Sequence, residues 1–140
     1  MNYFTIVAHG EGFDVDTFIK DSNLNIDSHW KLGEQKKQVC VPCEHKTSGI
    51  KITLEHSKNT NIYEQYKIAY RYLNANKDDL IFLQKYPNVK YFALGFLYLQ
   101  KVEPNLIGFS MSLPKPIMKV ALEIGIKTTY YVELNREDEH

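Results

Sequence analysis

The stretch VKYFALGFLYLQ, residues 89–100, decides the fold class of this 140-residue chain. It is apolar at nearly every position, which is typical of a central strand that is covered on both faces of its sheet. Pro87 stands just before the stretch and ends the helical pattern of the preceding segment. We therefore predict a central strand here, with Leu94 buried, and interpret the rest of the chain outward from it.

Five further segments favour strands, because apolar residues alternate or cluster in them. Four segments between these strands show helical spacing of apolar residues or the residues that begin and end helices. The predicted strands cover residues 3–9, 39–41, 50–54, 107–111 and 128–134, and the predicted helices cover residues 14–23, 62–73, 77–86 and 113–124.

The order of these elements predicts an α+β fold. Short turns at residues 44–48 and 102–105 would join neighbouring strands as hairpins. This favours a mostly antiparallel sheet of about six strands with helices packed on one face. Each end of the chain carries a strand, a Gly-Phe pair and a short helix, so a doubled ferredoxin-like unit also fits. We expect a single α+β domain over residues 1–135 and a short acidic tail over residues 136–140.

The composition excludes several classes of protein. The 17 Lys and Arg residues balance the 17 Asp and Glu residues, and Arg71 and Arg136 are the only arginines, so binding of nucleic acid through its phosphates is not expected. The chain shows no secretory leader and no apolar run of about 20 residues, the length that spans a bilayer. Two cysteines are too few for a disulfide scaffold. We expect a cytoplasmic protein with reduced thiols that binds no membrane.

The most suggestive chemical motif is CVPC at residues 40–43, with His45 close behind. A Cys-x-x-Cys pair can hold zinc or exchange thiols. Here Cys40 and Cys43 have no second cysteine pair to complete a zinc site, and no helix begins at them, so two incidental thiols are the alternative. The acidic pairs at residues 14–16 and 78–79 fit helix caps better than acid–base catalysis. We expect no catalytic residues, no metal and no cofactor, and therefore no enzyme.

Six residues are the candidates for binding. Two flank a glycine where the first strand meets the first helix, two form a His-Trp pair beside a run of lysines, and two are tyrosines beside the apolar stripe of a helix. The alternative for the tryptophan, the only one in the chain, is that it packs the first helix onto the sheet. The candidates are His9, Glu11, His29, Trp30, Tyr63 and Tyr70.

Three short motifs carry a resemblance to a known family: GFDVDTFI at residues 12–19, LNI at residues 24–26 and WKLGE at residues 30–34. With the order of elements that follows, they resemble the bacterial domain-of-unknown-function family 4279 over roughly residues 3–133. The family often places an Asp shortly before the final Tyr, whereas Thr128 and Thr129 precede Tyr130 here. The resemblance implies an α+β domain without catalytic residues and an association with immunity proteins and toxin neighbourhoods.

These observations favour a non-enzymatic bacterial binding protein that docks a protein partner, for instance as an immunity protein, or that associates with itself as a homodimer. The alternative is a protein that binds a small molecule, such as a protein that sequesters nucleotides in the conflict between phage and bacterium. A protein that docks a partner needs an exposed surface for that partner. A protein that binds a small molecule needs a pocket in which polar groups converge beside aromatic rings.

Overall fold

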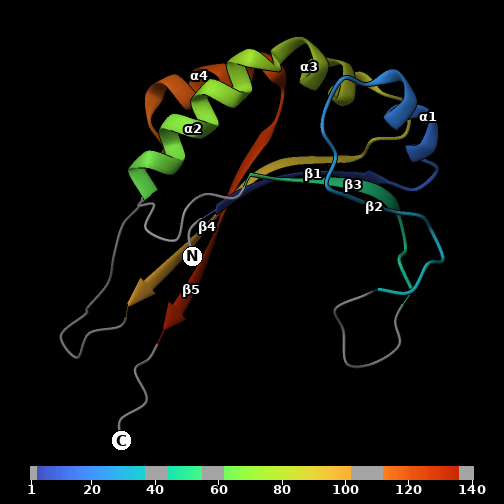
Figure 1. Ribbon diagram of the computed structural model, residues 1–140, viewed down its shortest axis with the longest axis horizontal. Coiled ribbons are helices and arrows are strands. Elements are labelled where there is room, and N and C mark those ends of the chain that lie inside the picture. The colour runs from blue at the N-terminus through green and yellow to red at the C-terminus, as the bar shows by residue number, and fades with distance from the viewer. Residues whose placement is uncertain (1–2, 37–43, 55–61, 102–111, 136–140) are drawn as a thin grey trace, which may run out of the picture.

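The computed structural model describes residues 3–36, 44–54, 62–101 and 112–135. Five strands and four helices follow one another along these parts of the chain (Figure 1). The elements are β1 (Tyr3–Gly10), α1 (Val15–Asp21), β2 (Ser28–Trp30), β3 (Ser48–Leu54), α2 (Ile62–Ala75), α3 (Lys77–Lys85), β4 (Tyr91–Lys101), α4 (Lys115–Ile124) and β5 (Lys127–Asn135).

The strands form one sheet in the order β2-β3-β1-β4-β5. The pairs β2–β3, β3–β1 and β1–β4 are antiparallel, and β4–β5 is parallel. The α+β class is confirmed, but the predicted sheet of about six mostly antiparallel strands is wrong, because the described sheet has five strands and is mixed. The parallel pair arises because α4 carries the chain back across the sheet, a connection that parallel neighbours require.

Two of the predicted strands, residues 39–41 and 107–111, lie outside the described residues. The structure adds β2, which the sequence did not reveal, because three residues are too few to show an alternation. The elements from β1 to β4 follow the βαββαβ connectivity of a ferredoxin-like unit, with its second helix divided into α2 and α3. The described residues contain one such unit, extended by α4 and β5, and not a doubled unit.

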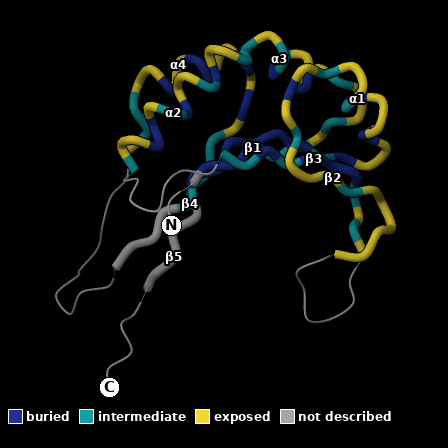
Figure 2. The backbone as a smooth tube through the Cα atoms, in the orientation of Figure 1, coloured by how far each residue is buried: buried dark blue, intermediate teal, exposed yellow. Residues whose placement is uncertain are grey.

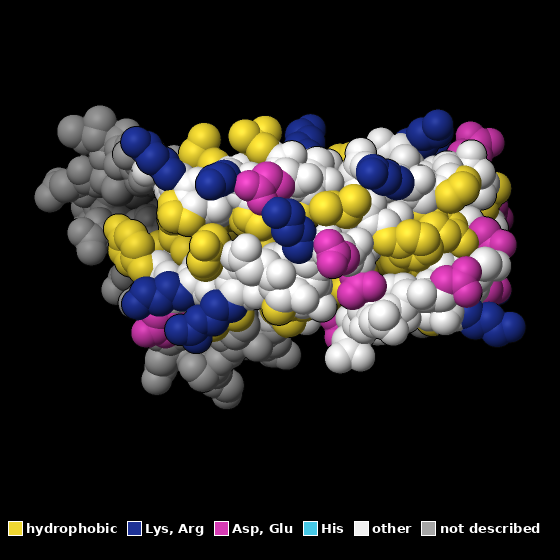
Figure 3. Space-filling model, turned by 90° about the horizontal axis from the view of Figure 1, so that it is seen from above, with side chains coloured by type: hydrophobic (Ala, Val, Ile, Leu, Met, Phe, Trp, Pro, Cys, Tyr) yellow, Lys and Arg dark blue, Asp and Glu magenta, His cyan; other side chains and the backbone are white. Residues whose placement is uncertain are grey.

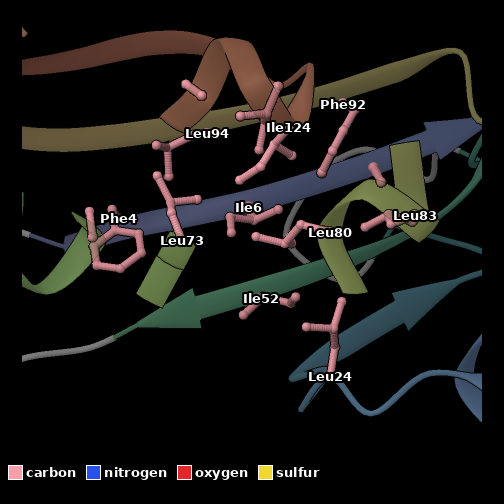
Figure 4. Packing of buried hydrophobic residues seen from close by; sticks show 14 of the residues in the cluster. Phe4, Ile6, Leu24, Ile52, Leu73, Leu80, Leu83, Phe92, Leu94 and Ile124 are labelled. Atoms are coloured by element: carbon pink, nitrogen blue, oxygen red, sulfur yellow. The ribbon is translucent and has the colours of Figure 1, made fainter. Parts of the chain in front are cut away.

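All four helices lie on one face of the sheet, as predicted, and the sheet is arched so that its helix-free face is concave (Figure 1). The buried residues line the boundary between the helices and the sheet (Figure 2). In this core Leu94 is fully buried, as predicted, and it lies close to Ile6, Leu73 and Ile124 (Figure 4). Helices therefore cover only one face of β4. The prediction that β4 is covered on both faces is wrong, because the second face of the sheet carries no helix.

Local sequence explains where the helices begin and end. Asp14 caps α1 by accepting hydrogen bonds from the backbone N–H and the hydroxyl of Thr17, at 3.2 and 2.7 Å. Asn76 interrupts the long helical segment between α2 and α3. Pro114 precedes α4, and Gly125 ends it with a left-handed φ of 83°, a conformation that glycine adopts without steric cost. The predicted helices are therefore confirmed in number and position.

Two tyrosines join the helix layer to the sheet. The hydroxyl oxygens of Tyr66 on α2 and Tyr130 on β5 lie 2.9 Å apart, and both rings contact the ring of Phe96. Both tyrosines face the core, and burial is the main cause that raises the pKa of Tyr130 above its usual value. Part of the high tyrosine content of the chain therefore belongs to the core.

Candidate functional site

The six predicted binding residues fall into two pairs and two single residues. Tyr63 and Tyr70 lie together on the helix layer, whereas His9 and Trp30 lie together on the helix-free face of the sheet. His29 is exposed on the short strand β2, and Glu11 is exposed in the turn after β1. The structure thus brings two predicted pairs together on opposite faces and assigns no shared site to the other two residues.

A groove runs between α2 and α4, and its first half is apolar. Tyr63 and Tyr70 are about two helical turns apart on α2, so both point to the same side. Tyr63 is 73% exposed and Tyr70 is 42% exposed, so both rings present apolar surface to solvent on the same side of α2. This half has a volume of about 370 Å³ and is lined by Tyr63, Tyr66, Lys67, Tyr70, Pro114, Pro116 and Ile117.

The second half of the groove is cationic. It has a volume of about 540 Å³ and is lined by Tyr70, Asn74, Lys115, Pro116, Lys119, Val120 and Glu123. Glu123 forms an ion pair with Lys77, and the hydrogen bond from Lys77 lowers the pKa of Glu123. Among the described residues, Lys115 and Lys119 form no ion pair. Because both halves include Tyr70 and Pro116, we treat them as one surface, the α2–α4 groove.

Apolar and charged side chains are unevenly distributed over the outer surface of the helix layer. Hydrophobic side chains gather with Lys and Arg at the α2–α4 end of the layer, and Asp and Glu are more frequent at the α1–α3 end (Figure 3). Met118 and Leu122, 47% and 80% exposed, lie one turn apart on α4 but do not line the groove. The helix layer therefore carries an apolar surface whose charged border is mainly positive at one end.

The helix-free face of the sheet carries a row of rings, which we call the ring row: His45, Trp30, His9 and Tyr91. Trp30 stacks on His45 with ring centroids 5.3 Å apart, and His9 stacks on Tyr91 with centroids 4.7 Å apart. Trp30, His9 and Tyr91 are joined by strand pairing, because Trp30 pairs with Gly49, Gly49 with His9, and His9 with Tyr91. Partial burial in this row lowers the pKa of His9.

Gly49 lets the two stacked pairs approach each other. A Cβ atom at this position would lie 2.3 Å from Cζ2 of Trp30 and 2.7 Å from Cβ of His9. The indole ring therefore occupies the space that any larger residue would fill. Because Trp30 lies on the face opposite the helices, the alternative that it packs α1 onto the sheet is wrong. An ion pair of 2.6 Å between Lys31 and Asp16 connects the end of β2 to α1 instead.

Several functional candidates were missed at the level of sequence. They are the lysines of the groove, Lys67, Lys115 and Lys119, and the lysines of the helix-free face, Lys51 and Lys127. For Lys115 and Lys119 a signal was present, since residues four apart on a helix are neighbours. For Lys51 and Lys127 no local signal exists, because only the strand order brings them to one face.

The chemistry of metals and membranes receives no support from the described parts of the chain. Within them, no group of three or more His, Cys, Asp or Glu residues lies close enough to hold a metal ion, and no helix has the length and apolar character that crossing a bilayer requires. Cys40 and Cys43 lie outside the described residues, so their role stays a prediction.

Comparisons with protein-family models, with curated proteins and with solved structures found no match to this chain. The resemblance to the domain-of-unknown-function family 4279 therefore stays a prediction.

Proposed function

We propose that this protein is a non-catalytic binding protein whose α2–α4 groove docks an acidic, apolar segment of a protein partner. The observation that carries the proposal is the continuity of the apolar and cationic halves through Tyr70 and Pro116. Exposed tyrosines beside prolines form a rigid apolar surface at little entropic cost. Such residues dominate the binding energy of many protein interfaces.

The charges of the groove determine the chemistry of the partner. Lys67, Lys115 and Lys119 line it, while Glu123, its acidic lining residue, is already paired with Lys77. An approaching segment with Asp or Glu would meet complementary charge there, which accelerates association and rejects basic partners. Its apolar side chains would pack between Tyr63 and Tyr70, and this burial would supply most of the affinity.

The class of binding protein that we propose is a bacterial immunity protein, which neutralises a toxin by binding to it. The resemblance described above favours that class over other binding proteins. Self-association through the same groove would require the groove to meet a copy of itself in a symmetric interface, with lysines facing lysines. The charge of the groove therefore favours a different chain as the partner.

Site-specific photo-crosslinking in the native host tests this proposal. A photoreactive residue is placed at position 70 or 119 in the groove, and at position 20 on α1 as the control. We expect adducts with one and the same protein from positions 70 and 119 but not from position 20. The crosslinked segment of that protein should contain acidic and apolar residues.

The charge-reversal variant Lys115→Glu/Lys119→Glu should remove the adduct formed at position 70 while leaving the circular dichroism spectrum unchanged. Because both lysines are exposed, this variant should fold. An adduct with a second copy of the chain, equal adducts from all three positions, or adducts from none of them would overturn the proposal.

A further inference from the structure

We propose that the helix-free face of the sheet binds a nucleoside monophosphate, with its base against the ring row and its phosphate between Lys51 and Lys127. This site is separate from the α2–α4 groove, since the sheet lies between the two (Figure 1). It does not depend on the function proposed for that groove.

The first argument is the arrangement of side chains in parallel rows across the strands. One row holds Trp30, His9 and Tyr91, with Gly49 between Trp30 and His9. Planar rings offer a surface on which a base can stack, whichever base it is. Lys127 lies beside this row, with its Nζ 6.0 Å from the centre of the Tyr91 ring.

The second argument is the charge of the next row. Lys51 pairs with Val7, Val7 with Ala93, and Ala93 with Lys127, so two lysines flank a small apolar centre. Neighbouring strands are about 4.8 Å apart, so the Cα atoms of the two lysines are separated by about 14 Å. Two lysine side chains that reach inward across that distance can both contact one phosphate.

No acid lies in the rows that hold these lysines and their neighbours. At the outward-facing positions within residues 5–9, 49–53, 91–95 and 127–129, Lys51 and Lys127 are the only residues with a formal charge, and Glu133 and Lys101 lie farther along β5 and β4. This part of the helix-free face therefore selects an anion. A phosphate is doubly charged or nearly so at neutral pH, and lysine binds it as a point charge.

The third argument is the row after that, which holds hydroxyl groups. Thr53 pairs with Thr5, Thr5 with Gly95, and Gly95 with Thr129. The Oγ1 atom of Thr129 is buried and has no hydrogen-bond partner in the described structure. Successive rows are about 7 Å apart, a span that the sugar of a nucleotide bridges. The hydroxyls lie on the far side of the cations from the rings, so they would donate hydrogen bonds to phosphate oxygens, while the sugar would span the distance between the rings and the cations.

Isothermal titration calorimetry with the full chain tests the proposal. The probes are adenosine, guanosine, cytidine and uridine monophosphate, together with adenosine, ribose 5-phosphate and inorganic phosphate. We expect at least one monophosphate to bind about tenfold or more tightly than adenosine and than ribose 5-phosphate, because only it engages both rows. Trp30 is the only tryptophan, so binding should also change the intrinsic fluorescence.

Two matched double variants locate the site. Lys51→Gln/Lys127→Gln should weaken binding of the monophosphate about tenfold or more, because the phosphate loses both cations. Lys115→Gln/Lys119→Gln removes the same charge from the opposite face and should leave binding unchanged. Tyr91→Leu keeps an apolar residue on the exposed side of β4 and should also weaken binding, while circular dichroism confirms that each variant is folded.

Three results would overturn the proposal. The first is that no monophosphate binds at millimolar concentration. The second is that inorganic phosphate binds as tightly as the monophosphates, which would reveal an anion site without a role for the rings. The third is that a single-stranded oligonucleotide binds far more tightly than any monophosphate, which would identify nucleic acid as the ligand. A loss of binding in the groove variant instead of the sheet variant would relocate the site and reject this one.

Discussion

At the scale of single residues, Gly49 determines where the only tryptophan lies. Its missing side chain makes room for the indole of Trp30, which in turn brings the ring row close to the backbone of β3. A glycine in a strand normally weakens the strand, because it has no side chain to pack. Here the indole ring of Trp30, on the neighbouring strand β2, packs against Gly49 and fills the space that a side chain would occupy.

We expect Gly49→Ala to lower the free energy of unfolding by about 1–3 kcal/mol, because the added Cβ overlaps the indole and the Cβ of His9. Urea denaturation followed by circular dichroism measures this change. In the background of Trp30→Ala the same substitution should cost less, since the nearest clashing atoms are gone. An equal cost in both backgrounds would show that the indole does not fill the space over Gly49.

The buried phenol of Tyr72 should make the free energy of unfolding decrease at alkaline pH. Burial, with a smaller contribution from Asp27 and Asp79, raises the pKa of Tyr72 to about 12. The unfolded value is about 10, so the folded state holds the phenolic proton more tightly. Its contribution to stability is therefore complete below pH 10 and is lost as the pH rises from about 10 to about 12.

We expect the free energy of unfolding of the wild type to fall as the pH rises from about 10 to about 12, and to fall less steeply in Tyr72→Phe. Urea denaturation at several pH values compares the two proteins. Tyr130 also has a raised pKa, so Tyr130→Phe should reduce the slope further when it is added to the first variant. Identical slopes in the wild type and in Tyr72→Phe would contradict the burial of this phenol.

At the scale of elements, β4 is the strand on which the fold depends most. It lies between β1 and β5, and its helix-facing residues Phe92, Leu94 and Phe96 are all buried. Its other face carries Tyr91 of the ring row and Ala93 between the two lysines. One strand thus supports both the core and the proposed nucleotide site.

We expect Leu94→Ala to lower the free energy of unfolding by about 2–5 kcal/mol, because the cavity it creates lies in the middle of the core. The matched control is Leu122→Ala on α4, whose side chain is 80% exposed and which should change stability by less than about 0.5 kcal/mol. Chemical denaturation measures both. Equal losses in the two variants would mean that β4 is peripheral.

Elements also show what can be predicted from sequence alone. The four longer strands and all four helices were predictable, because their apolar residues recur with a regular period. The short strand β2 and the parallel direction of β5 were not, since three residues carry no period and direction depends on the path of α4. Likewise, helical spacing predicts that Tyr63 and Tyr70 lie on the same side of α2. The proximity of His9 and Trp30 could not be predicted, because it depends on the order of the strands in the sheet.

At the scale of the whole molecule, the described residues share one hydrophobic core. Trp30 reports on the helix-free face, whereas far-ultraviolet circular dichroism reports mainly on the helices of the other face. We expect urea unfolding to give a single transition with the same midpoint by both measurements, as a cooperative domain of this size does. Separate midpoints would show that the sheet edge around β2 unfolds independently of the helix layer.

The position of β1 in the sheet has a consequence for how the protein is made. The ribosome produces β1 before both of its neighbours in the sheet, so one edge of β1 stays unpaired until residues 48–54 are made and the other until residues 91–101 are made. Until then the nascent strand presents unpaired backbone groups that can join another chain. Holdase chaperones that cover the emerging strand should therefore raise the yield of folded protein, whereas slower synthesis, which lengthens this exposure, should not.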